Sequence, residues 1–266
     1  MIVLCDGVEI GYDDVGTGMP VAFIHGFPHN RTLWAPQVSA LVDRARCIAL
    51  DLRGFGESSR NGPFTIDQYA DDLATLLRTL GIERAVVAGL SMGGYIAFAF
   101  WRRHREMVRA LVLADTRAGV DSEETRAKRI ALIELARARG SGAVADGQVV
   151  GMIGKTTRDK RPALIDDVHR MMGSSSVEGI RGALEAMLGR ADSTPTLSTI
   201  DVPTLVVVGA EDVLTPVREA EIMHDAIRGS RLEVIEQAGH VSNLERPGEF
   251  NDAVRAFCRA HPPRAA

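Results

Sequence analysis

Short apolar runs that alternate with helical patterns are the feature that most constrains the fold of this chain. The runs lie at residues 21–24, 45–50, 85–88, 111–114, 204–208 and 232–235. Runs that are apolar throughout are typical of parallel strands buried on both faces of a sheet. Helical patterns lie between them, around residues 33–43, 67–80, 92–105, 216–228 and 247–259. We therefore expect an α/β protein with a mostly parallel sheet and right-handed crossovers.

The N-terminus departs from this alternation. Residues 3–5 and 8–12 read as two short strands that are separated only by Asp6 and Gly7. Asp-Gly is a favoured two-residue turn between antiparallel strands. We expect a hairpin at this end of the chain.

The alternation also breaks between residues 119 and 195, where no strand-like run is found. Helical patterns at 122–139, 142–153, 160–172 and 177–189 fill this stretch, with Gly140 and Gly154 among the residues that separate them. Strand and helix patterns resume afterwards, so an insertion is favoured over an independent helical domain. We expect a core formed by residues 1–118 and 196–266, and a helical cap (lid) formed by residues 119–195.

Composition excludes several classes of protein. The chain has 266 residues, is 45% apolar and 25% charged, and carries a net charge of −4 without a dense basic run, so nucleic acid is not an expected partner. No segment approaches 18 consecutive apolar residues and no basic leader precedes an apolar stretch, so we expect a cytoplasmic protein without a membrane partner. Cys5, Cys47 and Cys258 are odd in number and far apart, which gives neither a disulfide framework nor a metal site.

Ser91 lies in the sequence Gly89-Leu90-Ser91-Met92-Gly93, directly after the apolar run 85–88 and before a helical pattern. A serine at the apex of a strand-turn-helix sits in a strained, exposed turn, where glycines on both sides avoid collisions with neighbouring backbone. The Gly-x-Ser-x-Gly pattern alone has little specificity, so other loops have to supply the remaining chemistry.

Three other loops follow apolar runs and carry polar side chains. They span residues 25–28, 209–212 and 238–240. Because the carboxyl ends of parallel strands meet at one edge of a sheet, we expect these loops to converge on Ser91. Together they supply serine, aspartate and histidine in the chain order that this type of turn requires.

We predict a Ser91–His240–Asp212 triad. A serine hydroxyl needs an adjacent base to take its proton, and His240 follows the last strand, where the base is expected. Asp212 is favoured as the carboxylate that orients the imidazole. Asp115, after the run 111–114, and Glu211, beside Asp212, remain alternatives.

The loop at residues 25–28 is expected to help stabilise the negative charge of a reaction intermediate. The backbone N–H groups of Phe27 and Met92 are the predicted oxyanion-hole donors. We expect His25 to brace this loop through hydrogen bonds. The residues predicted to contribute to the substrate pocket are His25, Gly26, His29, Trp34 and Val241.

Five segments give the chain a strong resemblance to the α/β-hydrolase superfamily, and most closely to small microbial carboxylesterases with a helical cap. They are residues 23–28, 51–58, 89–100, 114–118 and 238–240. The resemblance implies an eight-stranded, mostly parallel sheet, the triad above, and hydrolysis of short-acyl esters without a cofactor or metal.

The predicted function is therefore a serine carboxylesterase, whose partners are a small ester and water. A lactonase of the 3-oxoadipate enol-lactonase type is an alternative within the same fold, with perhydrolysis as a further side activity. A non-catalytic protein that binds a small molecule in the same pocket is the alternative from another class. The physiological substrate, the acyl-length limit and the oligomeric state are left open by the sequence.

Overall fold

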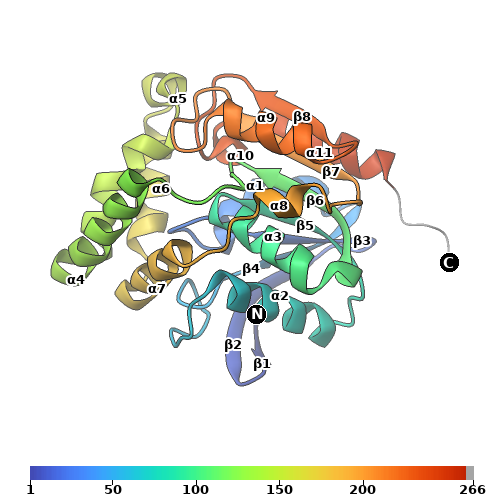
Figure 1. Cartoon of the computed structure of the whole chain (residues 1–266), viewed down its shortest axis with the longest axis horizontal. Coiled ribbons are helices and arrows are strands. Elements are labelled where there is room, and N and C mark those ends of the chain that lie inside the picture. The colour runs from blue at the N-terminus through green and yellow to red at the C-terminus, as the bar shows by residue number, and fades with distance from the viewer. Residues whose placement is uncertain (262–266) are drawn as a thin grey trace.

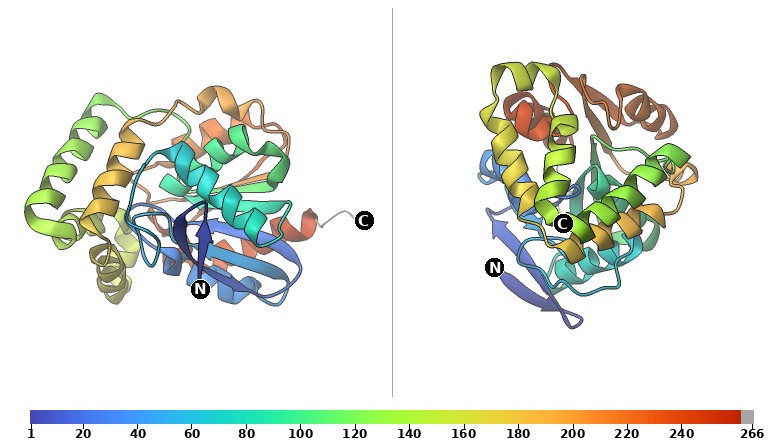
Figure 2. Two further views of the ribbon diagram at one scale, coloured as in Figure 1. Left: turned by 90° about the horizontal axis from the view of Figure 1, so that it is seen from below. Right: turned by 90° about the vertical axis from the view of Figure 1, so that its left-hand side faces the viewer.

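The computed structural model describes residues 1–261, in which eight strands form one sheet with helices on both of its faces (Figure 1, Figure 2). The strand order is β1-β2-β4-β3-β5-β6-β7-β8. The strands are β1 (Ile2–Cys5), β2 (Val8–Val15), β3 (Met19–Ile24), β4 (Ala45–Leu50), β5 (Ala85–Leu90), β6 (Val108–Ala114), β7 (Thr204–Gly209) and β8 (Arg231–Ile235). Strands β3 to β8 are parallel to one another, while β2 is antiparallel to both β1 and β4. The expected eight-stranded, mostly parallel sheet is confirmed.

Helices outside the insertion cover the two faces of this sheet. They are η1 (Arg31–Trp34), α1 (Ala35–Leu41), α2 (Ile66–Thr79), α3 (Met92–Arg103), η2 (Arg105–Met107), α9 (Val217–Ala226), α10 (Ser242–Glu245) and α11 (Pro247–Ala260). Apolar residues of α2, α3 and α9 belong to one buried cluster, and those of α1 and α11 belong to a second. The two clusters are the hydrophobic cores on opposite faces of the sheet.

Alternate residues of the central strands face these two cores. Ile24 and Val87 belong to the first cluster, whereas their chain neighbours Phe23 and Val86 belong to the second, and all four are at most 1% exposed. Successive side chains of a strand point to opposite faces, so a strand covered on both sides has to be apolar throughout. This explains why the continuous apolar runs became the parallel strands.

The N-terminal hairpin is confirmed as well. Asp6 and Gly7 have positive φ angles of 47° and 82°, and the register pairs Cys5 with Val8. Positive φ at both central residues is the requirement of a type I′ turn, which Asp-Gly satisfies at low cost.

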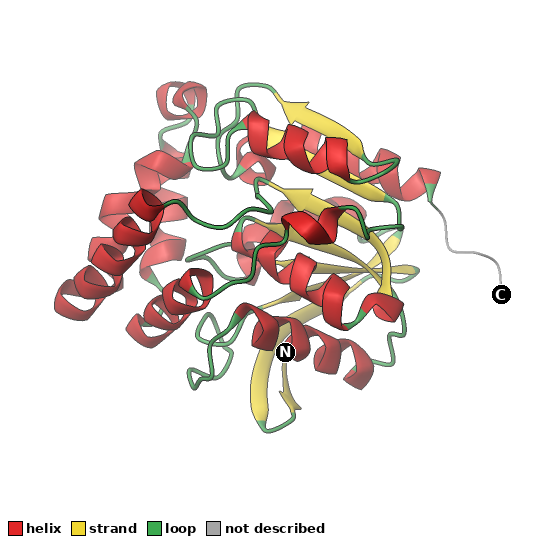
Figure 3. Ribbon diagram, viewed as in Figure 1, coloured by secondary structure: helices red, strands yellow, loops and turns green. Residues whose placement is uncertain are grey.

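The segment between β6 and β7, all of which the structure describes, contains helices joined by loops, and no strand. It forms α4 (Glu123–Met152), α5 (Lys155–Lys160), α6 (Ala163–Gly173), α7 (Val177–Leu188) and α8 (Thr194–Leu197). The expected break at Gly140 is confirmed, because its φ of 79° and ψ of −179° are not helical, and α4 is therefore two helices that meet at a kink, as predicted for 122–139 and 142–153. Helices α4 to α7 lie beside the sheet as a separate block (Figure 3). Its role as a lid stays a prediction.

The three cysteines, which all lie within the described residues, form no disulfide, and two of them are buried. All three are free, Cys5 and Cys47 are buried, and burial raises the pKa of the Cys47 thiol to about 12.

Over residues 1–261, no helix is long and apolar enough to cross a membrane. The same residues hold no cluster of three or more His, Cys, Asp and Glu side chains suited to a metal ion.

Candidate active site

Ser91 occupies a strained turn between β5 and α3, with φ of 56° and ψ of −113°. The glycines around it are required by close backbone contacts. A Cβ atom at Gly93 would lie 2.3 Å from the carbonyl oxygen of Ile24, and one at Gly89 would lie 2.2 Å from the carbonyl oxygen of Gly93. Such contacts leave no room for any side chain, so the Gly-x-Ser-x-Gly pattern is a steric requirement of this turn.

The neighbouring strand end holds this turn in place. The Ser91 N–H donates to the carbonyl oxygen of Ala114 at 2.9 Å, and the Thr116 hydroxyl donates to the carbonyl oxygen of Ser91 at 2.7 Å. A Cβ at Gly94 would lie only 2.3 Å from that Thr116 hydroxyl. Strain of this kind persists where the surroundings over-determine the backbone.

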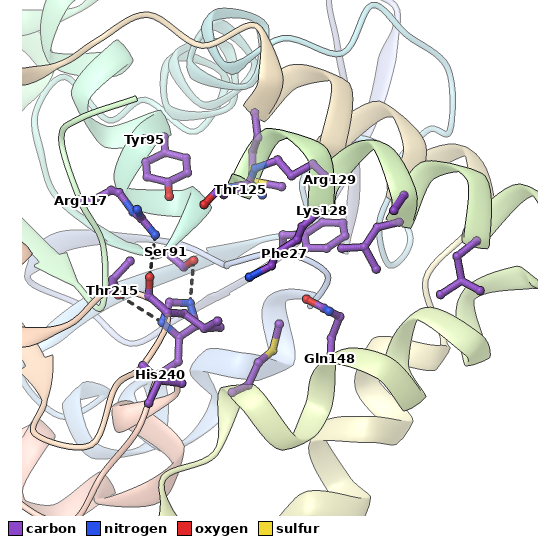
Figure 4. Close-up of a pocket in the computed structure, with 17 residues that line it drawn as sticks. Phe27, Ser91, Tyr95, Arg117, Thr125, Lys128, Arg129, Gln148, Thr215 and His240 are labelled. Carbon is purple, nitrogen blue, oxygen red and sulfur yellow. Dashed lines mark hydrogen bonds between the residues drawn. The ribbon is translucent and has the colours of Figure 1, made fainter. Parts of the chain in front are cut away.

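His240 connects the serine to a carboxylate. Its Nε2 lies 2.8 Å from Ser91 Oγ, although the two residues are 149 positions apart, and its Nδ1 lies 2.8 Å from Asp212 Oδ2. His240 is 3% exposed and Asp212 is 5% exposed. Figure 4 shows the imidazole pointing toward Ser91 at the end of the pocket. These distances fall within the range for proton transfer between a hydroxyl and a base.

Asp212 is held by donors from its own loop. Its Oδ1 accepts the N–H groups of Leu214 and Thr215 at 2.8 and 2.9 Å. Its Oδ2 accepts the Thr215 hydroxyl at 2.7 Å in addition to its contact with His240. Both carboxylate oxygens are therefore occupied, and the orientation of the carboxylate toward the imidazole is fixed.

The two groups shift each other's pKa. Burial raises the pKa of Asp212, but the charge of His240 and the hydrogen bonds from His240 and Thr215 outweigh it, and the pKa is lowered from its ordinary value. Burial lowers the pKa of His240, but the charge and hydrogen bond of Asp212 outweigh this effect, and its pKa is raised above 6.5. The pair is thus an ionised carboxylate beside an imidazole that takes up a proton readily.

The two alternative acids have other partners. Asp115 is fully buried, and its carboxyl accepts the Gly209 N–H at 2.9 Å and the Ser242 hydroxyl at 2.6 Å. Burial and the nearby charge of Asp212 raise the pKa of Asp115 well above its ordinary value. Glu211 turns toward the cap, where it accepts the Thr156 N–H at 2.7 Å. Among these three carboxylates, only Asp212 is hydrogen-bonded to His240.

Two backbone N–H groups beside Ser91 have no acceptor in the described part of the chain. They belong to Phe27, whose side chain lines the pocket together with Ser91, and to Met92, the first residue of α3. Free N–H groups are expected in the first turn of a helix, where they attract negative charge.

The five residues predicted to contribute to the substrate pocket require a correction. None of His25, Gly26, His29, Trp34 and Val241 is among the residues that line the cavity at Ser91, and all five are buried. The predicted bracing role of His25 is observed, because its Nδ1 lies 2.8 Å from the Gly26 carbonyl oxygen and its Nε2 accepts the Leu52 N–H at 3.0 Å.

His29 and Trp34 show why proximity in sequence was misleading. Burial is the main cause that lowers the pKa of His29 to about 3, so this imidazole is neutral inside the protein. Trp34 packs against Phe23, with ring centroids 5.1 Å apart, and against Phe250 at 6.0 Å. After the loop at residues 25–28, the chain enters η1, where Leu33 and Trp34 belong to the second buried cluster.

The pocket at Ser91 has a volume of about 550 Å³. Loops that follow the strands, helix α3, and helices α4 and α7 of the inserted segment provide its walls, which include Leu132, Leu135, Met152 and Met187. Polar side chains such as Thr125 and Gln148 line the cavity as well. A cavity that combines apolar walls with polar groups near a reactive side chain is typical of a small-molecule site.

Several residues of this site were missed by the sequence reasoning. Thr215 follows Asp212 by three positions, the spacing at which a carboxylate accepts N–H and hydroxyl groups of its own turn, so this signal was available. Arg117 lies in the loop after β6. The rule that functional side chains follow the carboxyl ends of parallel strands could therefore have identified it. Gln148 and the basic residues of α4 carried no sequence signal, because they depend on how the cap docks.

Comparisons with known proteins agree with this geometry. A family model described as alpha/beta hydrolase fold matches residues 19–247. The 3-oxoadipate enol-lactonase 2 of Acinetobacter baylyi is 32% identical over 242 residues, which cover 89% of this chain and 87% of that protein. A thermophilic esterase from Thermogutta terrifontis, solved with malate bound, is 39% identical with a TM-score of 0.94 over 98% of both chains. A bromoperoxidase from Bacillus anthracis is 26% identical with a TM-score of 0.87, over 97% of this chain and 100% of that one.

Proposed function

Because the chain belongs to the alpha/beta hydrolase fold family, we propose that it is a serine carboxylesterase that cleaves short-chain carboxylic esters through an acyl-enzyme. The observation that carries this proposal is the pair of 2.8 Å contacts that link Ser91 Oγ, His240 and Asp212. The similarity to an esterase and to an enol-lactonase, which both cleave esters of a carboxylic acid, supports the same class of reaction.

The first half of the reaction acylates Ser91. His240 Nε2 takes the hydroxyl proton while Ser91 Oγ attacks the ester carbonyl carbon, and the C=O electron pair moves onto the oxygen. Asp212 stabilises the imidazolium that forms and keeps Nδ1 as its donor. When the tetrahedral intermediate collapses, the bond to the alcohol oxygen breaks, and His240 gives its proton to the departing alcohol.

The second half releases the acid. Water occupies the place of the alcohol, His240 takes one of its protons, and the resulting hydroxyl group attacks the acyl carbon. Collapse of the second tetrahedral intermediate returns the proton from His240 to Ser91 Oγ. Neither step needs a cofactor or a metal, since His240 stores the proton between attack and release.

The negative charge of both intermediates requires fixed donors. The N–H groups of Phe27 and Met92 are our candidates, because both lie beside Ser91 and neither has an acceptor within residues 1–261. Loss of one such donor costs roughly 10²–10³-fold in rate in related chemistry.

A lactonase is the second candidate, favoured by the 32% identity to 3-oxoadipate enol-lactonase 2. The same steps open a lactone, with the difference that the alcohol remains attached to the acyl group. Comparison of a cyclic with an acyclic ester of similar size separates the two activities. Perhydrolysis, in which peroxide replaces water in the second half, is a side activity that the similarity to a bromoperoxidase favours.

The test is hydrolysis of short alkyl esters by the wild type and by Ser91→Ala. We expect the variant to lose at least about 10³-fold in rate, because Ser91 is the attacking group. A fluorophosphonate probe should label the wild type and not the variant. Equal hydrolysis by the two proteins would end the proposal, and a protein that binds small molecules but fails to label would favour the non-catalytic alternative.

A further inference from the structure

The pocket at Ser91 is lined by basic side chains without acidic ones. Arg117, Lys128 and Arg129 are on its wall, and no Asp or Glu is among the described residues that line it. This polarity is unexpected for neutral esters, which carry no charge that a basic group could recognise. The question is which of these cations is available to a ligand.

Two of the three cations are already paired within the cap. Arg129 Nε donates to Asp121 Oδ2 at 2.6 Å, and the Asp121 side chain is fully buried. Lys128 Nζ lies 2.7 Å from Glu124 Oε1, with 71% of the lysine side chain exposed to solvent. Arg129 shares Asp121 with Arg190, whose Nη1 lies 3.0 Å from Asp121 Oδ1, but each of the three nitrogen atoms of Arg129 has a partner, Asp121 or Met187 Sδ. The charge of Lys128 is compensated by Glu124 and screened by water.

Arg117 differs from both. Its Nη2 donates to the carbonyl oxygen of Leu214 at 2.6 Å, but no ion pair links it to any described carboxylate. Its Nε is buried and has no hydrogen-bond partner within residues 1–261. A guanidinium stays charged at any physiological pH and has five N–H donors, most of which are left free here.

Arg117 lies close to the reacting residues Ser91 and His240. It lies in the loop directly after β6, and its acceptor Leu214 precedes Thr215, the residue that holds Asp212. In Figure 4 its nitrogen atoms point toward the side of the pocket where Ser91 and His240 lie. Its positive charge also lowers the pKa of His240, which is consistent with this short separation.

A carboxylate is the group that fits these donors. A guanidinium binds carboxylates through two parallel N–H···O bonds, and leaving its charge and a buried N–H without a partner costs free energy. A carboxylate bound there would remove both costs. Because Arg117 lines the same cavity as Ser91, that carboxylate would belong to the molecule whose ester bond is cleaved.

We propose that Arg117 binds a carboxylate carried by the substrate, so that the preferred substrates are short esters or lactones with one free carboxylate group. This inference rests on the proposed ester hydrolysis and adds the substrate class to it. The carboxylate is located either on the acyl group or on the alcohol, and the experiment includes an arm for each.

The experiment compares kcat/KM for pairs of esters in which a carboxylate in one ester replaces a terminal methyl group in the other. Monomethyl glutarate and methyl pentanoate place the carboxylate on the acyl side, and 3-acetoxypropanoate and propyl acetate place it on the alcohol side. In at least one pair we expect the anionic ester to be favoured about tenfold or more by the wild type. In Arg117→Met, that selectivity ratio should fall to about one or below, while Arg117→Lys retains part of it.

Arg126→Met is the matched control. Arg126 is also an arginine that donates to a backbone carbonyl, that of Leu188 at 2.9 Å, but it does not line the pocket. The substitution removes the same charge from the protein and should leave the selectivity ratio unchanged. A wild-type ratio of one or below in both pairs would overturn the proposal, as would a ratio that survives in Arg117→Met.

A binding measurement separates this inference from the proposed function. Glutarate, which cannot be hydrolysed, is titrated calorimetrically into the wild type and into Arg117→Met, with uncharged glutaramide as the reference. We expect glutarate to bind the wild type more tightly than glutaramide does, and to lose that advantage in the variant. If no ester is cleaved by any of these proteins, the proposed function fails and this titration alone decides the inference. Equal binding of glutarate by both proteins, or none, would refute it.

Discussion

The Thr215 hydroxyl donates to Asp212 Oδ2 at 2.7 Å, and the same oxygen lies 2.8 Å from Nδ1 of His240. Thr215 Oγ1 is also 3.2 Å from that Nδ1, so threonine, carboxylate and imidazole are in mutual contact. The other carboxylate oxygen accepts two backbone N–H groups of the same loop. Thr215 therefore acts through Asp212, by holding the carboxylate in the orientation that the imidazole needs.

Substitution Thr215→Val should lower kcat/KM by about tenfold, because it removes a hydrogen bond to a charged group but keeps the shape of the side chain. Thr215→Ser retains the hydroxyl and should stay close to the wild type. Steady-state kinetics on one neutral ester provide the comparison. If the valine variant matched the serine variant, the hydroxyl would have no positioning role.

Asp212→Asn and Asp115→Asn distinguish the two buried aspartates near His240. We expect about a 10⁴-fold loss of kcat in Asp212→Asn, because an amide no longer favours the imidazole tautomer that accepts the serine proton. The loss in Asp115→Asn should be far smaller, since Asp115 contacts Gly209 and Ser242 and not the imidazole. Circular dichroism and the midpoint of unfolding would verify that both variants are folded. The opposite order of activities would assign the acid to Asp115.

The dependence of activity on pH follows from His240. Its pKa is raised above 6.5, and only the neutral imidazole accepts the Ser91 proton, so kcat/KM should rise with pH through a midpoint above 6.5. Profiles of a neutral ester between about pH 5 and pH 9 measure this midpoint. The charge of Arg117 lowers the pKa of His240, so Arg117→Met should move the midpoint to higher pH. A wild-type midpoint below 6.5 would contradict the raised pKa of His240.

Gly93→Ala tests the steric basis of the Ser91 turn. The new methyl group would lie 2.3 Å from the Ile24 carbonyl oxygen, which belongs to a central strand, and we expect a loss in the free energy of unfolding of about 3 kcal/mol. Gly147→Ala is the control, because Gly147 is exposed in α4 and has open space around it. That substitution should stabilise the protein by about 1 kcal/mol through helix propensity. Denaturant titrations of both variants measure these changes, and similar stabilities would show that the turn tolerates a side chain.

The architecture of the core could be predicted from the sequence because its signals are local. Continuous apolar runs identify strands that are covered on both faces, as Phe23 and Ile24 show by facing different cores. The Asp6-Gly7 turn and the glycines around Ser91 are required by backbone geometry within a few residues. The order of serine, aspartate and histidine along the chain likewise placed each of them at the end of a parallel strand.

The wall of the pocket could not be predicted, because it depends on contacts between distant segments. Trp34 follows the loop at residues 25–28, but its side chain packs against Phe23 in the core, and His29 is fully buried as well. The cap residue Gln148 reaches the cavity only through the docking of α4 on the core.

The sequence by itself determined the sheet, the strained serine and the residue types that reach the ends of the strands, because periodicity and backbone sterics act over short distances. Tertiary structure alone decided that Asp212 and not Asp115 contacts His240, although both follow neighbouring parallel strands. It also left Arg117 as a cation without an acidic partner in the described chain beside Ser91. These contacts depend on the direction of the loops. Packing between segments that are far apart in the sequence sets that direction.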